Sequence, residues 1–531
     1  MNVPQGDLEM SDQPDHFASE PEQLEYLGAS DSPSHAGARR WSAITAASVA
    51  VVVAAGAGAW GVAQLMAGGE SAATAVPAGA VAYLSIDLDP SASQKVQALT
   101  TLKKFPAIAE QLDLGVRDDV RRWVFEQAQQ DGQCEDVDYA ADVEPWLGDR
   151  MAVAAVPSDS GSVMPLVVLQ VSDQDAARAG ADKLSECAGE DVSVAFVGDY
   201  MLLSEKQGDV EDMAAAAESA SLADDPGFAD WMDRVGDPGI VTAYASGDAP
   251  QALIESGVAE SADDGGLAGQ IGSLYEDFEG AAAVVRFADG SIEAETASAG
   301  LPASFASGEG VPTLGTLPAT TAAALSIGLP EGWLQDYTQS MQDMMGQEGS
   351  ADDFWADLER GSGFDLPEDI ETLFGDGFTV AVDSSADFET AMESSEPPRI
   401  PVGLRISGDP AEIAGVLDKV FAQAGDVQDA VWVRETEDGV TVGLQQEYVD
   451  QLVAGGSLAG SDSFQRVVPD ADRAGAVFYV DFDAGNGWAE QLAQALGDEQ
   501  VVENVAPLDA VGISTWTDGG TSHGLFRMTT D

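Results

Sequence analysis

The string Gly520-Thr521-Ser522-His523-Gly524, near the end of the chain, has the G-x-S-x-G form of a nucleophile motif. A nucleophile elbow needs a helix after the serine and a histidine base later in the chain. Only seven residues follow Gly524 and none is histidine, and in a strand His523 would point to the opposite face from Ser522. The sequence therefore predicts a Gly-rich turn entering the last strand, and no Ser-His-Asp site.

The sequence contains few side chains arranged to bind a metal ion. His16, His35 and His523 are the only histidines, too few and too scattered for a zinc site. The segment Asp481-x-Asp483-x-Gly485-Asn486-Gly487 resembles the opening of a calcium loop, but its twelfth position is Leu492, where a bidentate Glu is needed. We expect these acidic residues, like Asp87 at another strand end, to cap helices and turns, and we assign no metal ligands.

The sequence also defines no site for phosphate binding or for hydrolysis. None of the six lysines follows a glycine, so no phosphate-binding loop of the Walker type exists. Carboxylate pairs of the glycosidase kind are possible, but 93 Asp and Glu residues give no basis for choosing one pair. We assign no catalytic residue and no cofactor-binding residue, and a surface hydrolase that uses paired carboxylates stays an alternative.

Tryptophans and cysteines are the remaining side chains of interest. Eight tryptophans could line a carbohydrate or lipid groove, although aromatic residues on amphipathic segments usually belong to a core: Trp123, Trp146, Trp231, Trp333, Trp355, Trp432, Trp488 and Trp516. Cys134 and Cys187 are the only cysteines. We expect them to form a disulfide on the oxidising side of a membrane, the alternative being two buried thiols.

The overall charge excludes several partners. The chain of 531 residues holds 93 acidic and 22 basic residues, a formal net charge of -71. Such a field repels nucleic acid and anionic headgroups and attracts cations nonspecifically. It is typical of a saline or cation-rich setting, because salt screens the self-repulsion. With 45% hydrophobic residues the chain can still bury a large core, and its length predicts several domains.

An apolar run near the start of the chain predicts how the protein is placed relative to a membrane. Residues 41–67 are almost free of polar side chains and long enough to cross a bilayer, and Arg39 and Arg40 precede them. The positive-inside rule then places residues 1–40, a disordered acidic tail, in the cytoplasm and the rest of the chain outside. A cleaved signal peptide is the rival interpretation. Small residues four apart within the run favour dimerisation only weakly.

The rest of the chain is a duplication. An offset of 236 positions carries Asp173, Asp182 and Lys183 onto identical residues, and the segments before and after repeat in the same order at slightly different offsets. The first repeat covers residues 70–298 and the second residues 314–531, with a Gly/Pro/Ser-rich linker at 299–313.

Strands alternate with helices in both repeats, and hairpins occur among them. One predicted helix begins at Asp409-Pro410, where Asp409 caps the first turn and Pro410 takes the first position. We therefore expect an α+β fold: a single N-terminal transmembrane helix followed by two tandem repeats with largely antiparallel sheets, packed into one pseudo-twofold body with a groove between them.

The segment from Val76 to Pro90, together with Phe105-Pro106 and Trp146 to Arg150, resembles the opening of the bacterial domain of unknown function 3352 family. The resemblance covers about residues 70–528. It implies a membrane-anchored envelope protein with a duplicated α+β ectodomain, and it supplies no activity, ligand or functional residue.

These observations favour a noncatalytic, single-pass protein of the cell envelope. Its duplicated acidic ectodomain would bind an envelope protein or an apolar ligand such as a lipid. The alternatives are the carboxylate-dependent hydrolase and a structural or salt-tolerance component of the envelope.

Overall fold

The structure is a computed structural model. It describes residues 71–88, 137–158, 163–188, 192–255, 277–288, 290–301, 314–335, 362–386, 400–424, 430–485, 487–496 and 499–531, with isolated positions between 97 and 125 and between 337 and 360.

Within these residues the chain forms sixteen strands. In chain order they are β1 (Ala82–Asp87), β2 (Leu147–Pro157), β3 (Val163–Val171), β4 (Ser193–Val197), β5 (Tyr200–Ser204), β6 (Val241–Ser246), β7 (Gly280–Ala288), β8 (Ser291–Ala299), β9 (Thr321–Gly328), β10 (Gly377–Asp383), β11 (Val402–Ser407), β12 (Trp432–Thr436), β13 (Gly439–Gly443), β14 (Ala476–Asp481), β15 (Leu508–Asp518) and β16 (Thr521–Thr530).

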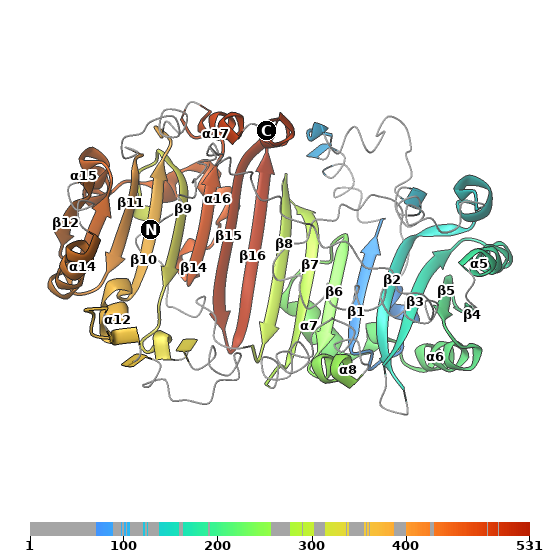
Figure 1. Ribbon diagram of the computed structural model, residues 1–531. Helices are drawn as coiled ribbons and strands as arrows, with labels where there is room; N and C mark the ends of the chain where they lie inside the picture. Colours follow the sequence, from blue (N-terminus) through green and yellow to red (C-terminus); the bar gives the residue numbers. More distant parts are fainter. Residues whose placement is uncertain are drawn as a thin grey trace, which may run out of the picture.

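All sixteen belong to one antiparallel sheet with the order β12-β13-β11-β10-β9-β14-β15-β16-β8-β7-β6-β1-β2-β3-β5-β4 (Figure 1). This order is symmetric about the pair β16–β8. Each of the strands β1–β8 on one side of the pair has its counterpart, numbered eight higher, at the mirrored position on the other side. We call β1–β8 with their helices the first copy and β9–β16 with theirs the second copy. The internal duplication seen in the sequence is therefore visible in the topology.

The predicted fold class is wrong in one respect. The two repeats do not keep separate sheets with a groove between them, because β8 and β16 pair and merge them into one continuous sheet. No helix among the described residues is both long and apolar enough to cross a membrane. The predicted tail at 1–40 and the predicted membrane helix at 41–67 lie outside the described residues.

The seam between the copies has near-twofold symmetry. Ser291 pairs with Thr529 and Ala299 with Thr521 across β8 and β16. An offset of 230 positions equates Ser291 with Thr521 and Ala299 with Thr529. Each pair therefore recurs with its members exchanged, as in an isologous contact between two identical subunits. One strand edge of each copy is covered by the other copy, which removes an unpaired edge.

Ten α-helices lie in the described residues: α5 (Gln174–Ala188), α6 (Gln207–Ser219), α7 (Pro226–Arg234), α8 (Ala249–Glu255), α12 (Glu368–Phe374), α14 (Pro410–Ala424), α15 (Gln446–Ala454), α16 (Asp462–Val467), α17 (Trp488–Leu496) and α18 (Glu499–Val505). Short 3-10 or π turns are η1 (Ala72–Ala75), η2 (Tyr139–Val143), η3 (Leu222–Asp224), η5 (Leu314–Thr316), η7 (Leu458–Gly460) and η8 (Ala471–Arg473).

Each copy covers one face of the sheet, the packed face, with an equivalent helical layer. Helices α6 and α7 bury Tyr83 in the first copy, and α15 and α16 bury Tyr479 in the second. Phe228 meets the rings of Tyr83 and Tyr244 edge-on, with centroids 5.7 and 5.2 Å away. Phe464 packs in the same way on Tyr479 at 5.1 Å. The duplicated aromatic residues thus form the two main cores.

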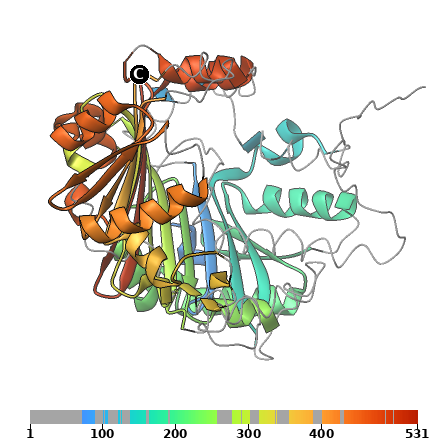
Figure 2. The same ribbon diagram turned by 60° about the vertical axis from the view of Figure 1, so that its left-hand side comes forward.

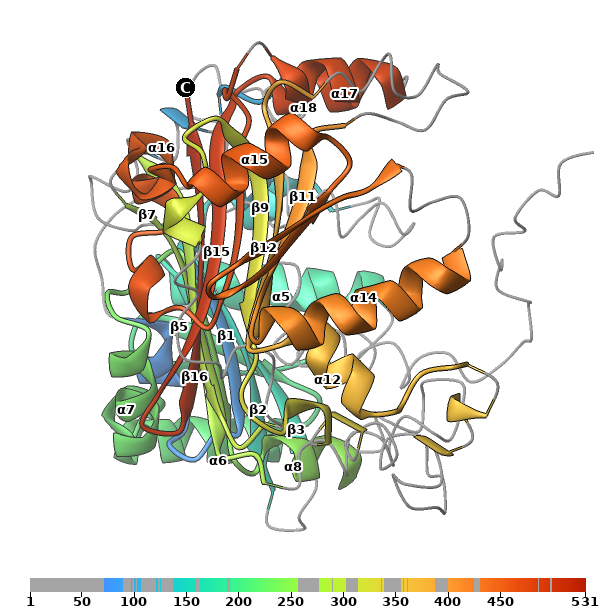
Figure 3. The same ribbon diagram turned by 90° about the vertical axis from the view of Figure 1, so that its left-hand side faces the viewer.

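The other face is covered by helices at its two ends. Helix α5 packs on Leu169 and Met201 near one end, and α14 packs on Leu404 and Val442 near the other. Both helices lie on the same side of the curved sheet, as Figures 2 and 3 show.

Both end helices begin with the same cap. The Oδ1 atom of Asp409 accepts hydrogen bonds from the backbone N–H groups of Ala411 and Glu412 at 2.9 and 3.1 Å, which confirms the predicted cap. In the first copy the equivalent Asp173 accepts the N–H of Ala176 at 2.9 Å.

Candidate functional site

The face that carries α5 and α14 at its ends holds no charged side chain on the nine central strands of the described sheet. We call this surface the charge-free face. Its side chains, grouped along the sheet, are Phe378, Val380, Val382, Ala323, Leu325, Ile327, Ala476, Phe478, Val480, Val511, Ile513, Thr515, Thr517, Ser522, Gly524, Phe526, Met528, Ile292, Ala294, Thr296, Ser298, Ala281, Ala283, Val285, Phe287, Val241, Ala243, Ala245, Ala82, Leu84 and Ile86.

Residues directly opposite each other in paired strands share a face, so one line of side chains can be followed across the whole sheet. From β12 to β4 it runs Val433, Val442, Leu404, Val380, Leu325, Phe478, Ile513, Phe526, Ala294, Val285, Val241, Ile86, Met151, Leu169, Met201 and Phe196. Every member is apolar, in a chain of which 22% is charged.

Three neighbours in this line are open to solvent. Leu325, Phe478 and Ile513 are 38%, 39% and 38% exposed. Phe478 lies between the other two, pairing with Leu325 on β9 and with Ile513 on β15. We call these three residues the apolar row. Large apolar side chains that adjoin one another at the surface mark contact sites more often than scattered ones do.

The charges of the central strands lie on the packed face. Glu293, only 2% exposed, forms ion pairs with Arg286 and Arg527. Arg286 also pairs with Glu295. Burial alone would lower the pKa of Arg286, but its bonds to Glu295 and Glu293 raise it. Since Glu293 and Arg286 lie in the first copy and Arg527 in the second, this network joins the copies across the seam.

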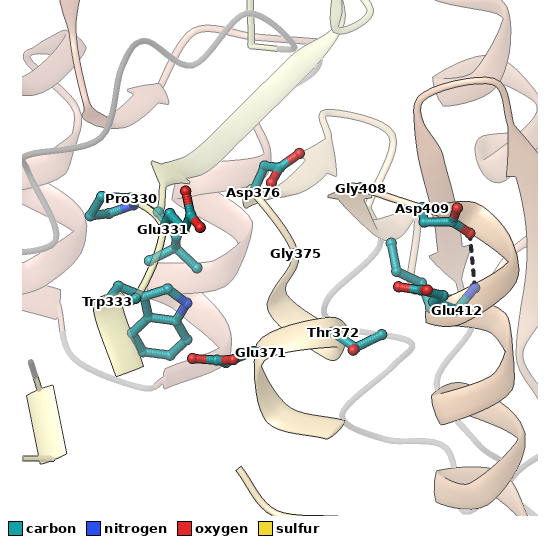
Figure 4. Close-up of a pocket in the computed structure, with 13 residues that line it drawn as sticks. Pro330, Glu331, Trp333, Glu371, Thr372, Gly375, Asp376, Gly408, Asp409 and Glu412 are labelled. Atoms are coloured by element: carbon teal, nitrogen blue, oxygen red, sulfur yellow. Dashed lines mark hydrogen bonds between the residues drawn. The ribbon is translucent and has the colours of Figure 1, made fainter. Parts of the chain in front are cut away.

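A pocket of about 380 Å³ lies in the second copy, where β9 ends and where α12 and α14 meet the sheet. Its lining contains five carboxylates and no lysine or arginine: Leu329, Pro330, Glu331, Gly332, Trp333, Glu371, Thr372, Gly375, Asp376, Gly408, Asp409, Glu412 and Ile413. We call it the acidic pocket. Figure 4 shows the carboxylate of Glu371 extending toward the indole of Trp333.

The walls of the acidic pocket are fixed by local structure. Trp333 packs edge-on against Phe374 of α12, with the ring centroids 5.8 Å apart. Gly375 ends α12 at φ 56°, a conformation that favours glycine, and an added Cβ would lie 2.0 Å from the Ser407 carbonyl oxygen. The carboxylate of Asp409 is occupied as the cap of α14. The other carboxylates form no ion pair with the described lysines and arginines.

Another group of carboxylates lies at the opposite edge of the sheet, around the end of β14, the start of β15 and the end of β16. Asp483, Asp509 and Asp531 place carboxylate oxygens within 4.8 Å of one another. Burial, then the neighbouring Asp531, Asp509 and Asp481, raise the pKa of Asp483 to about 6. Asp509 is already bonded to Arg466 at 2.8 Å and to the Thr529 hydroxyl at 2.6 Å. The group could accept a cation, and its acids repel one another in the absence of one.

The sequence motifs have structural roles. Ser522 and His523 lie within β16 on opposite faces, as predicted, and His523 stacks on Trp516 at 5.2 Å on the packed face. Burial lowers the pKa of His523. Asp481 accepts hydrogen bonds from the Ser463 hydroxyl at 2.7 Å and from its own turn, through the N–H of Asp483, at 3.1 Å. Asp87 pairs with Arg150 at 2.9 Å.

Most of the tryptophans belong to the core, as expected. Buried indoles are those of Trp146, Trp231, Trp355, Trp488 and Trp516. Trp333 lines the acidic pocket, Trp432 is exposed, and Trp123 lies outside the described residues. Cys187 is disulfide-bonded. Its predicted partner Cys134 also lies outside the described residues, so the Cys134–Cys187 pair stays a prediction.

Neither the apolar row nor the acidic pocket was predicted. Alternating apolar residues in β9 and β14 were visible in the sequence, but they do not reveal which face stays uncovered. The pocket residues come from three separate segments of the chain that only the fold brings together.

The chain thus combines a duplicated antiparallel sheet, a helical layer on its packed face and a charge-free face covered by helices at its two ends. It belongs to the family described as "Protein of unknown function (DUF3352)", whose model matches residues 43–397. The resemblance noted from the first strand and its flanking motifs is confirmed.

No curated protein matches the chain. A solved structure, titled "Structure of crystal form III of TP0453", shows a likeness at 10% identity, covering 45% of this chain and 82% of that one, with a TM-score of 0.21. A TM-score this low supports no argument about fold or function.

Proposed function

We propose that this protein is a noncatalytic binding protein that holds an apolar ligand against the charge-free face of its sheet. The observation that carries the proposal is the apolar row, Leu325, Phe478 and Ile513, exposed in the middle of a face that bears no charge. Leaving apolar surface in water costs about 25 cal/mol per Å², so binding of a ligand that covers the row is favoured.

The size of the row supports a small ligand. Three side chains that are each about two-fifths exposed offer on the order of 200 Å² of apolar surface. A stable protein interface buries about 800 Å² on each partner. The row therefore suits a hydrocarbon chain better than a folded protein. A second copy of this chain is disfavoured as well, because each carries a net charge of -71.

We also propose an extracytoplasmic location. The disulfide of Cys187 supports it, because disulfides persist mainly outside the cytoplasm.

Titration with dodecyl maltoside, a neutral single-chain amphiphile, below its micelle concentration tests the binding function. We expect saturable binding to the wild-type protein and about tenfold weaker binding to a variant with Phe478→Ser and Ile513→Ser. A matched control removes two apolar side chains of similar exposure elsewhere, with Leu301→Ser and Val453→Ser, and should bind as the wild type does. Equal weakening in both variants, or no binding to the wild type, would contradict the proposal.

A further inference from the structure

We infer that the ligand is a single-chain amphiphile with a cationic head, whose hydrocarbon chain lies on the apolar row and whose head lies in the acidic pocket. This inference rests on the proposed function and adds the chemical class of the ligand.

The apolar row and the acidic pocket are continuous along β9. Leu325 belongs to the apolar row, and Leu329, four residues further along, lines the acidic pocket. At about 3.3 Å per residue these two positions are about 13 Å apart along the chain. Between them Ile327 lies on the same face as Leu325. An extended ligand can therefore keep apolar contact from the row to the pocket.

The charge of the pocket favours a cation. Its lining offers Glu331, Glu371, Asp376, Asp409 and Glu412 and no basic side chain. A carboxylate, sulfate or phosphate head would be repelled here, whereas an ammonium head would be attracted. The indole of Trp333 adds a π face beside Glu371, and aromatic rings next to carboxylates are suited to quaternary ammonium groups (Figure 4).

The equivalent carboxylates of the first copy have arginine partners. An offset of 227 positions equates Glu371 with Glu144 and Asp376 with Asp149. Glu144 pairs with Arg122 and Asp149 with Arg121, both at 3.4 Å. In the second copy Glu371 and Asp376 have no described arginine or lysine as partner. Among the described residues, this segment is thus paired with arginines in the first copy and carries unpaired carboxylates in the second.

The volume of the pocket is consistent with this head group. At about 380 Å³ it falls at the lower end of small-molecule sites, large enough for a trimethylammonium group. A whole folded domain could not enter it.

The test compares three amphiphiles that share a dodecyl chain and differ in head: trimethylammonium, maltoside and sulfate, each below its micelle concentration in 0.15 M salt. We expect the trimethylammonium compound to bind at least tenfold more tightly than the maltoside, and the sulfate to bind most weakly. The preference for the cation should fall as salt is raised, because salt screens the charges.

Because the whole protein is acidic, charge-matched variants separate the pocket from the general field. Glu371→Gln with Glu412→Gln should weaken trimethylammonium binding about tenfold and leave maltoside binding unchanged. Asp212→Asn with Glu218→Gln removes two exposed charges on α6 and should change neither. Trp333→Leu should weaken only the cation, by about twofold to fivefold.

The outcomes distinguish this inference from the proposed function. If maltoside and trimethylammonium bind equally, or if the α6 variant weakens the cation as much as the pocket variant does, the inference fails and the apolar site stands. If no dodecyl compound binds, both fail.

Discussion

The two copies share their topology, their helix caps and their aromatic cores. They differ at the positions of the apolar row and of the acidic pocket. Leu325, Phe478 and Ile513 form an exposed apolar row in the second copy. The equivalent row in the first copy is Leu84, Ala243 and Ala283, where two of the side chains are methyl groups.

The second difference lies in the segment around the start of β10 and β2. Among the described residues, its carboxylates have no arginine or lysine partner in the second copy and pair with arginines in the first. A duplicated unit needs one set of packing residues in each copy, so those residues are the same. Residues that differ without changing the fold point to a task carried out by one copy only.

The largest expected effect on stability comes from substitutions in the core that the two copies share. Phe464→Ala should lower the free energy of unfolding by about 3–5 kcal/mol, because it leaves a cavity against Tyr479. Phe228→Ala in the first copy should cost a similar amount, since Phe228 packs on two tyrosines. Urea unfolding followed by tryptophan fluorescence measures both. A cost below 1 kcal/mol for either variant would contradict the claim that the two phenylalanines have the same role in their cores.

The next effect tests the seam. Glu293→Gln should cost about 3 kcal/mol, because it leaves two arginines beside each other with too little countercharge in a buried site. Asp450→Asn, which removes the exposed partner of Arg434, should cost less than 1 kcal/mol. Calorimetry should show one unfolding transition for the wild type. A cost for Glu293→Gln no larger than that for Asp450→Asn would show that the network does not hold the copies together.

A smaller effect depends on pH. The pKa of Asp483 is raised to about 6, above its ordinary value, so the charged form carries a penalty in the folded state that is small at pH 4 and complete at pH 8. Asp483→Asn should therefore stabilise the protein at pH 8, by about 1 kcal/mol after solvent screening, and change its stability much less at pH 4.

The equivalent residue in the first copy is Asp248, and Asp248→Asn is the matched control for thermal unfolding at both pH values. A gain from Asp483→Asn that is the same at pH 4 and pH 8 would contradict repulsion within the Asp483, Asp509 and Asp531 group.

The smallest effect has opposite signs in the two copies. Glu144→Gln removes an exposed ion pair with Arg122 and should destabilise by up to about 0.5 kcal/mol. Glu371→Gln removes charge from a loop rich in carboxylates and should stabilise by a similar amount. Thermal shift measurements at low salt, where surface charges matter most, resolve the two signs. Equal signs would mean that the two loops have the same electrostatics.

The sequence predicted the duplication, the cap at Asp409 and the separation of Ser522 from His523, because each depends on local spacing or on strict alternation along a strand. It did not predict that the sheets of the two copies would merge into one continuous sheet. Pairing between β8 and β16 depends on two edges that are more than 220 residues apart in the chain, and alternation alone does not indicate which edge finds a partner.

The candidate site was missed for a related reason. Glu371, Asp409 and Trp333 look like ordinary surface residues among many, and only the ends of three strands bring them to one pocket. Phe478 and Ile513 look like core residues in the sequence, and their exposure depends on which helices reach that part of the sheet.

Photolabelling tests the central claim most directly. A dodecyl maltoside analogue with a diazirine near the end of its chain would be bound below its micelle concentration, irradiated, and the labelled peptides identified by mass spectrometry. We expect labels to gather on the segments that contain Leu325, Phe478 and Ile513, with the equivalent segments around Leu84, Ala243 and Ala283 unlabelled. Equal labelling of the two copies, or labels confined to the helices of the packed face, would contradict the account.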